Sequence, residues 1–139
     1  MSYVVTAASG QLGRHVVRSL LRRGVAAAEI VATARDVAAI EDLAALGVRV
    51  RRLDYAEPSS IDGAFAVGDR VLLISGTAFG ERVGQHGNVI RAASAAGVGL
   101  LAYTSAPYAD TSSMRLVQEH LATEQVLIAS GLPYSRRAI

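Results

Sequence analysis

Residues 4–21, VVTAASGQLGRHVVRSLL, run from an apolar strand through a glycine-containing turn into an amphipathic helix. Apolar side chains recur at helical spacing on one face of that helix, at Leu12, Val16, Val17, Leu20 and Leu21. The first N–H groups of a helix have no partner within it, and together with the helix dipole they attract an anion. The stretch therefore predicts a strand–turn–helix unit whose turn can hold phosphate groups.

Four glycines mark the ends of predicted helices. Each ends an apolar-periodic stretch and is followed directly by Val or Leu: Gly24, Gly47, Gly97 and Gly131. The residue just past a helix often adopts a left-handed conformation, which is easiest for glycine. A short β-rich run follows the first three glycines, at residues 29–34, 48–53 and 98–104. This repeat of helix, glycine and strand predicts an α/β protein with a Rossmann-like, doubly wound parallel sheet.

The character of each run predicts its place in the sheet. Residues 71–75 and 100–104 are continuously apolar, as strands buried on both faces are, whereas VRVRRL at 48–53 alternates and suits a sheet edge. We therefore expect the strand order 3-2-1-4-5. The run after Gly131, LPYSRRAI, contains two arginines that are poor material for a buried strand. We expect a truncated sixth strand, and hence a sheet one strand short.

Composition narrows the class of protein. The 139 residues, 51% of them hydrophobic, are enough for one domain with a core. The lack of cysteine excludes a disulfide scaffold and a cysteine nucleophile, and it fits a cytoplasmic location. A net charge of +2 and three scattered histidines predict no nucleic-acid partner and no metal site. We see neither a signal peptide nor a run approaching the ~18 apolar residues of a membrane span.

The turn after the first strand reads TAASGQLG, from Thr6 to Gly13. Gly10 would let a pyrophosphate approach the backbone, and Gly13 would let the helix lie close to the first strands. The spacing resembles the G-x-x-G-x-x-G loop of short-chain dehydrogenases, with Ala7 in place of the first glycine. If that position needs a positive φ, the methyl group costs about 1–2 kcal/mol, whereas an extended Ala7 costs close to nothing. The sequence leaves both conformations open.

The end of the second strand bears on the choice of nucleotide. A carboxylate there accepts hydrogen bonds from the adenine ribose of NAD, whereas an arginine suits the 2′-phosphate of NADP. Arg35 follows the strand directly, and Asp36 is well placed to cap the next helix. We therefore expect NADP(H) to be favoured over NAD(H), with a plain surface arginine as the alternative. After the third strand, Asp54 is a candidate acceptor for the adenine amino group, or a helix-leading aspartate, and Tyr55 is a candidate neighbour of the ring.

Seven stretches, in order along nearly the whole chain, resemble the NmrA-like, atypical short-chain dehydrogenases and most closely the type 2 NAD(P)H:quinone oxidoreductases. They are TAASGQLG, VATARD, LDYAEPSSIDGAF, VLLISG, GERVGQHGNVIRAASAAGV, LLAYTSAPYADTSS and EHLATEQVLIASGLPY. The resemblance implies a Rossmann fold that binds NADPH and passes hydride to a quinone. It implies cofactor contacts from Ala7 to Leu12 in the loop, from Arg35 at the 2′-phosphate, and from Ser75, Gly76 and Thr77 after the fourth strand. Together with the loop residues and third-strand candidates above, the expected cofactor site comprises Thr6, Ala7, Ala8, Ser9, Gly10, Gln11, Leu12, Gly13, Arg35, Asp54, Tyr55, Ser75, Gly76 and Thr77.

Besides Ala7, the sequence departs from this family after the GLPY stretch. Relatives continue there into an apolar strand and a C-terminal portion that helps to form the substrate pocket, whereas this sequence reads SRRAI. We therefore expect residues 1–139 to form an NAD(P)-binding Rossmann domain that lacks the usual C-terminal substrate-binding portion.

Catalytic residues are less clearly marked. The chain contains no lysine, so the Tyr-x-x-x-Lys pair of short-chain dehydrogenases is absent. Tyr103 and Ser105, at the end of the fifth strand, are candidates to hydrogen-bond a substrate oxygen, with a buried structural tyrosine as the alternative. His120 and Glu124 are four residues apart on a predicted helix, which suits either proton transfer or an ordinary helix-face contact. Hydride transfer to an electron-poor quinone needs mainly close placement, and water can supply the proton.

Three functions are compatible with these features. The first is a cytoplasmic NADPH-dependent oxidoreductase that reduces a small-molecule acceptor such as a quinone. The second is a non-catalytic NADP(H)-sensing module of the NmrA-like kind, and the third is an inactive truncated remnant. We expect no membrane partner, and the sequence leaves the oligomeric state open, a homodimer included.

Overall fold

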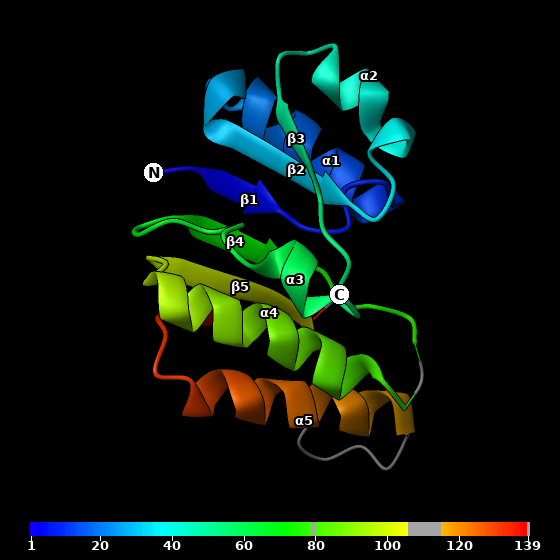
Figure 1. Cartoon of the computed structure of the whole chain (residues 1–139), viewed down its shortest axis with the longest axis vertical. Helices are drawn as coiled ribbons and strands as arrows, with labels where there is room; N and C mark the ends of the chain where they lie inside the picture. The colour runs from blue at the N-terminus through cyan, green and yellow to red at the C-terminus, as the bar shows by residue number, and fades with distance from the viewer. Residues whose placement is uncertain (79, 106–114, 139) are drawn as a thin grey trace.

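The computed structural model describes residues 1–78, 80–105 and 115–138. Its helices and strands alternate along the chain (Figure 1). The elements are β1 (Tyr3–Val5), α1 (Gln11–Arg22), η1 (Ala27–Glu29), β2 (Ile30–Ala34), η2 (Val37–Ile40), α2 (Glu41–Ala44), β3 (Arg49–Arg52), α3 (Pro58–Ile61), β4 (Arg70–Leu73), α4 (Arg82–Ala96), β5 (Leu100–Ser105), α5 (Arg115–Ala129) and β6 (Tyr134–Ala138).

The described strands form one parallel sheet in the order β3-β2-β1-β4-β5-β6. The order confirms the Rossmann-like prediction and the edge position of β3. The order in which strands are added to the sheet switches sides between β1 and β4. β2 and β3 are added on one side of β1, and β4 to β6 are added on the other. Ligands of doubly wound sheets bind beside the carboxyl ends of the strands at this switch point.

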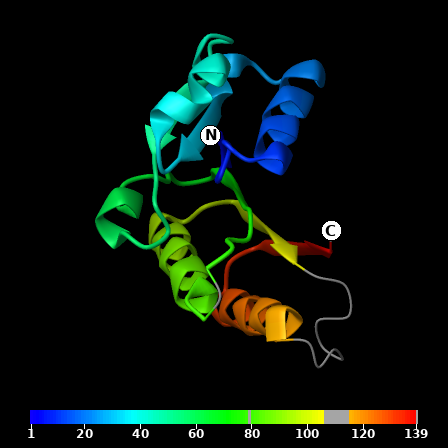
Figure 2. The ribbon, with the colours of Figure 1, turned by 90° about the vertical axis from the view of Figure 1, so that its right-hand side faces the viewer.

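Alternate strand residues face two apolar clusters, as the two-residue period of a strand requires. Val4 and Val71 belong to a cluster that includes residues of α4 and α5, whereas Val5 and Ala32 belong to a cluster that includes Val17 of α1. In Figures 1 and 2, α1 and α2 lie at one end of the molecule, and α4 and α5 pack side by side at the other. The two faces of the sheet are therefore covered by different helices, α1 on one face and α4 and α5 on the other.

The predicted helix-ending glycines all adopt left-handed backbone. Their φ angles are +90° at Gly24, +89° at Gly47, +73° at Gly97 and +74° at Gly131. A β-carbon is strained at such angles, so glycine lets each helix stop and the chain turn back within a few residues. The glycine repeat therefore predicted the helix–strand alternation for the right physical reason.

The expectation of a sheet one strand short is wrong. β6 pairs with β5 in parallel register, with Leu101 opposite Tyr134 and Ser105 opposite Ala138. Arginine is tolerated here because β6 lies at the edge of the sheet, and a guanidinium can leave an edge strand to reach solvent or a partner. Arg136 reaches back to Glu124 of α5, with 3.2 Å between its guanidinium nitrogen and the carboxylate oxygen.

The first turn of α1 lies directly against the loop that follows β1. A β-carbon placed on Gly13 would stand 2.5 Å from the carbonyl oxygen of Ala7 and 2.6 Å from Cα of Ala8. Both distances are too short for any side chain, and both involve backbone atoms that cannot rotate away. Only glycine lets the helix begin here, which confirms the close packing predicted for this residue.

We expect Gly13→Ala to destabilise the protein by about 2 kcal/mol. Alanine normally gains about 1 kcal/mol over glycine inside a helix, but overpacking against backbone costs roughly 3 kcal/mol and decides the sign. Gly10→Ala is the matched control, because its β-carbon would lie 3.6 Å from the oxygen of Ala7, an ordinary van der Waals distance. Urea denaturation measures both variants, and equal effects at the two glycines would contradict the packing argument.

Candidate functional site

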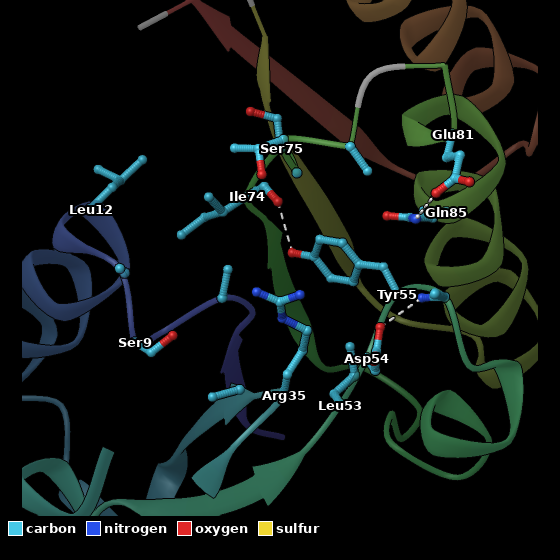
Figure 3. A pocket seen from close by; sticks show the side chains of 18 of the residues that line it. Ser9, Leu12, Arg35, Leu53, Asp54, Tyr55, Ile74, Ser75, Glu81 and Gln85 are labelled. Atoms are coloured by element: carbon cyan, nitrogen blue, oxygen red, sulfur yellow. Dashed lines mark hydrogen bonds between the residues drawn. The ribbon is translucent and has the colours of Figure 1, made fainter. Parts of the chain in front are cut away.

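A cavity of about 630 Å³ opens beside the carboxyl ends of β1 to β4, at the switch point of the sheet. Its volume falls within the range of roughly 300–1,000 Å³ that is usual for small-molecule and cofactor sites. Four chain segments line it, and Figure 3 shows their side chains turned toward one space. They are the β1–α1 loop (Ala7 and 9–13), the end of β2 (Ala34, Arg35), residues 53–56 after β3, and residues 74–78 with Glu81 and Gln85 after β4.

The β1–α1 loop presents the start of α1 to this cavity. Gly10 is the N-cap residue, with extended backbone (φ −78°, ψ 171°), and Ser9 and Gly10 are both exposed. Within the described residues, no side chain caps this helix and its first turn carries no acidic residue. The N–H groups of the first turn are therefore left for water or for a ligand, as an anion site requires.

Ala7 has a φ of +50°, and among the described residues it is the one non-glycine with a positive φ. This decides the alternative that the sequence left open, in favour of the strained conformation. The oxygen of Ala7 accepts a hydrogen bond from the Gly10 N–H at 3.2 Å. The same oxygen lies where a β-carbon on Gly13 would point. The loop therefore closes tightly even though its first position carries a methyl group.

Thr6 and Ala8, which were predicted as cofactor contacts, lie beneath the loop and do not belong to the cavity lining. Both are completely buried. The Thr6 hydroxyl donates to the Leu72 oxygen at 2.9 Å and accepts from the Ile74 N–H at 3.0 Å, and the Ala8 N–H donates to Thr33. Thr6 and Ala8 therefore support the loop from below, and neither residue is placed to contact a cofactor in the cavity.

Arg35 and Asp36 separate as their order in the sequence predicted. Asp36 is the N-cap of η2, where its carboxylate accepts a hydrogen bond from the Ala38 N–H at 3.0 Å. Arg35 is exposed and lines the cavity. In the described part of the chain, its guanidinium has neither a hydrogen bond nor an ion pair, whereas Arg14 and Arg52 are paired with Asp42 and Glu57. An arginine held at a cavity without a protein partner is available for an anionic ligand.

Asp54 and Tyr55 form the wall that faces Arg35 in Figure 3. Asp54 closes its own turn, since its Oδ1 accepts from the Ala56 N–H at 2.9 Å. The Tyr55 hydroxyl lies 2.7 Å from the Ile74 oxygen and 2.6 Å from the Thr6 hydroxyl. Burial raises the pKa of Tyr55, so the phenol stays protonated and donates. Tyr55 thereby ties the third-strand loop to the end of β4.

Ser75, Gly76 and Thr77 follow β4 and all line the cavity. Side chains from other elements hold the backbone of this loop. The Ser75 N–H donates to the Thr104 hydroxyl at 2.8 Å, and the Gly76 N–H donates to Nε2 of His86 at 2.8 Å. Further on, the Gly80 N–H donates to the Glu119 carboxylate at 2.6 Å.

The three candidate catalytic residues are not part of the cavity lining. Tyr103, Ser105 and His120 are 1%, 7% and 6% exposed. The Tyr103 hydroxyl lies 2.6 Å from Nδ1 of His120, and Arg82 approaches Nε2 of His120 at 3.4 Å. Because a guanidinium can only donate, Nε2 accepts and Nδ1 carries the proton toward Tyr103. The Ser105 hydroxyl is buried and has no hydrogen-bond partner within the described ranges.

Burial dominates the titration of this polar cluster. It lowers the pKa of His86 to about 4, and the charge of Arg82 acts in the same direction. Burial and Arg82 also hold the pKa of His120 below its usual range, although Glu124 opposes them. Burial raises the pKa of Tyr103 to about 12. Both histidines are thus neutral at pH 7. Glu124 bonds Arg136 of β6 rather than His120, so the predicted helix-face pair has other partners.

Sequence reasoning missed several lining residues and one residue behind them. Ala34, Leu53, Ala56, Ile74, Ala78, Glu81 and Gln85 line the cavity because they flank the predicted strand ends, and the rule that ligands lie at those ends could have found them. The residue behind them is His86, whose partners are 10 and 37 residues away. No local pattern reports contacts at such separations.

Two further features bear on the class of protein. Over residues 1–78, 80–105 and 115–138, no helix is both long enough and apolar enough for a membrane crossing. In these same ranges, no group of three His, Asp or Glu side chains could hold a metal ion. The sheet, its switch point and the phosphate-type loop together define a nucleotide-binding protein of the Rossmann class.

The chain belongs to the family described as NAD(P)H-binding, which matches residues 7–135. Quinone oxidoreductase 2 of Escherichia coli (strain K12) is 45% identical to it over 131 residues, which are 94% of this chain and 46% of the relative. These matches confirm the resemblance that the sequence motifs indicated.

Two solved structures are similar over 98% of this chain. The Citrobacter sp. triphenylmethane reductase complexed with NADP(H) has a TM-score of 0.90 and 40% identity, and 48% of it is covered. The NADPH-dependent quinone oxidoreductase QOR2 of E. coli complexed with NADPH has a TM-score of 0.88 and 44% identity, and 47% of it is covered. The chain spans about half the length of the relatives it matches.

We expect Ala7→Gly to stabilise the protein by about 0.5–1 kcal/mol. Glycine removes the cost of about 1–2 kcal/mol of a left-handed alanine but gives back part of it through the entropy of the unfolded chain. Ala8→Gly is the control, because this buried neighbour has no positive φ and should lose stability. Thermal unfolding measures both, and a destabilised Ala7→Gly would show that the loop carries no strain.

Proposed function

We propose that the cavity binds NADPH and that the chain is the coenzyme-binding part of a reductase that delivers hydride to a quinone. The proposal is supported by the quinone oxidoreductase and the NADP(H)-bound reductase among its relatives. The observation that carries it is the exposed Arg35 guanidinium, which lines the cavity with no partner in the described part of the chain. The lack of cysteine suits a cytoplasmic location.

The residues present fit such a coenzyme. The uncapped start of α1, with Ser9 to Gly13 around it, would hold the pyrophosphate against backbone N–H groups. Arg35 would bind the 2′-phosphate, because a doubly charged phosphate matches the guanidinium by charge and by hydrogen-bond geometry. Asp36 is already engaged as a helix cap and does not compete for the adenine ribose. These features favour NADP(H) over NAD(H).

The part of the cavity beyond the phosphates would receive the nicotinamide. NADPH supplies the hydride when bound, and the chain contributes mainly placement. Ser75, Gly76 and Thr77 lie on a loop whose amides are held by Thr104 and His86, so this wall is rigid. The candidate catalytic roles of Tyr103, Ser105 and His120 have no support in this geometry, since all three are buried outside the lining. A quinone needs no protein acid, because water can protonate the product.

A non-catalytic NADP(H)-sensing module is the second candidate. The observation behind it is that Tyr103 and His120, both candidates for a catalytic role, bond internal partners and do not line the cavity. Such a module would bind the coenzyme in the same cavity with the same residues. The two candidates therefore differ in turnover and not in binding.

We expect Arg35→Ala to weaken NADPH binding about 10- to 100-fold and to leave NADH binding within about twofold. A charge-assisted hydrogen bond contributes about 1.5–3 kcal/mol, and NADH lacks the phosphate that forms it. Arg22→Ala is the matched control, since Arg22 bonds Ser19 on α1 and is absent from the cavity lining. Fluorescence titration measures both affinities. Equal losses for the two coenzymes would overturn the assignment of Arg35.

We expect the purified chain to consume NADPH in the presence of a benzoquinone, as measured by the absorbance of the reduced nicotinamide. Gly10→Asp should abolish both binding and consumption, because a carboxylate at the helix start repels the pyrophosphate. Binding without consumption would show that this chain does not transfer hydride on its own and would favour the sensing module. Absence of binding in the folded wild-type chain would reject both.

A further inference from the structure

We propose that His86 is a positioning residue of the nucleotide site. Its Nε2 atom accepts a hydrogen bond from the Gly76 N–H and so fixes the loop after β4, residues 74–78, in the shape that the coenzyme would contact. The inference rests on the proposed function, because it concerns how the same cavity is kept ready for NADPH.

The contact is direct and partly buried, with the imidazole on its inner side. The Gly76 nitrogen lies 2.8 Å from Nε2, and the His86 side chain is 0% exposed. The rings of Tyr55 and Tyr103 flank the imidazole, with ring centroids 6.0 and 5.4 Å away. Gly76 itself lines the cavity. One atom pair therefore connects the wall of the cavity to the core behind it.

The Gly76 N–H sets the tautomer of His86, and the second ring nitrogen has a partner of its own. A backbone N–H can only donate, so Nε2 is unprotonated and the proton of the neutral ring lies on Nδ1. Nδ1 lies 3.0 Å from the hydroxyl oxygen of Thr123 and donates to it. Thr123 is 0% exposed and belongs to α5. The imidazole thus links α5, through α4, to the loop after β4, and it cannot turn over without losing both bonds.

The charge state of His86 suits this role. Burial and the neighbouring Arg82 of α4 and His120 of α5 lower the pKa of His86 to about 4. Near neutral pH the ring is therefore uncharged and Nε2 remains an acceptor. A protonated ring would present a second N–H to the Gly76 N–H, and the loop would lose its attachment.

Two other side chains hold neighbouring parts of the same loop. Thr104 of β5 accepts from the Ser75 N–H, and Glu119 of α5 accepts from the Gly80 N–H. These contacts keep the loop attached when His86 is changed, so a His86 variant need not unfold the protein. They also make the expected defect local to Gly76.

Two amide variants separate the halves of the imidazole. His86→Gln places a polar atom near the position of Nε2 and can keep the bond to Gly76, whereas His86→Asn reaches only as far as Nδ1 and keeps the side toward Thr123. We expect fluorescence titration to give an NADPH affinity within about threefold of wild type for His86→Gln and a loss of about tenfold or more for His86→Asn. The loss of the acceptor for a partly buried N–H accounts for that difference.

Hydrogen exchange at the Gly76 amide of the coenzyme-free protein is the second readout. It should be fast in His86→Asn and slow in wild type and His86→Gln, and this result does not depend on NADPH. If wild type fails to bind NADPH while Gly76 behaves as expected, the proposed function falls and the attachment of the loop stands. If wild type binds NADPH and the two variants bind it equally well or equally poorly, the positioning role is overturned.

Thr123 provides a second pair of variants should His86→Asn fail to fold. Thr123→Val removes the acceptor of the Nδ1 proton and frees the ring, whereas Thr123→Ser keeps the hydroxyl. We expect weaker NADPH binding and faster Gly76 exchange in Thr123→Val alone. Unchanged binding and exchange in this variant would also contradict the role assigned to His86.

Discussion

The contact between Gly13 and the backbone of Ala7 and Ala8 is the constraint on which the site depends. With 2.5 and 2.6 Å available to a β-carbon, only a hydrogen atom fits between the helix and the loop. This approach brings the start of α1 to the carboxyl edge of the sheet. It also leaves the chain little room between β1 and the helix, and Ala7 takes up the turn with a left-handed backbone. The strain at Ala7 and the exposed helix start thus have one origin.

The electrostatics of the cavity depend on which charged side chains already have partners within the protein. Asp36 is occupied by a helix cap and Asp54 by its own turn, so each carboxylate near the second and third strands already has a backbone partner. Arg35 lines the cavity and has no partner in the described residues. In the described lining, a negative ligand meets the Arg35 guanidinium and backbone N–H groups, with the carboxylates of Asp54 and Glu81 elsewhere on the wall. In the proposed function this guanidinium would bind the phosphate that distinguishes NADP(H) from NAD(H), while Asp36 stays engaged as a helix cap.

Local rules predicted most of the fold. Helix-ending glycines at Gly24, Gly47, Gly97 and Gly131 and the alternating run at 48–53 gave the strand order and the edge of the sheet, because each depends on a residue's own backbone or exposure. The prediction of a sheet one strand short was wrong because the exposure of the last run was misjudged. The two arginines were weighed as members of a buried strand, whereas β6 lies at an edge and Arg136 has Glu124 as a partner.

The site was less predictable because parts of it depend on distant contacts. The loop motif and Arg35 could be placed by their position after a strand. The conformation of Ala7 could not, since its φ is set by how closely α1 packs. Thr6 and Ala8 belong to the motif but point into the core, and the buried pair of Tyr103 and His120 lies behind the cavity. A motif gives the order of residues along a loop, and only the packing decides which side faces the ligand.

The polar residues buried among β5, α4 and α5 have a common explanation in the loop after β4. The described residues of that loop lie in neither helix nor strand, so their N–H groups find partners on other elements. Thr104, His86 and Glu119 supply acceptors for Ser75, Gly76 and Gly80. Each acceptor then needs its own partner within an apolar core, which Thr123 supplies for His86 and Arg82 for Glu119. The polar cluster is therefore the consequence of holding an irregular loop rigidly at the edge of the sheet, where a coenzyme can use it.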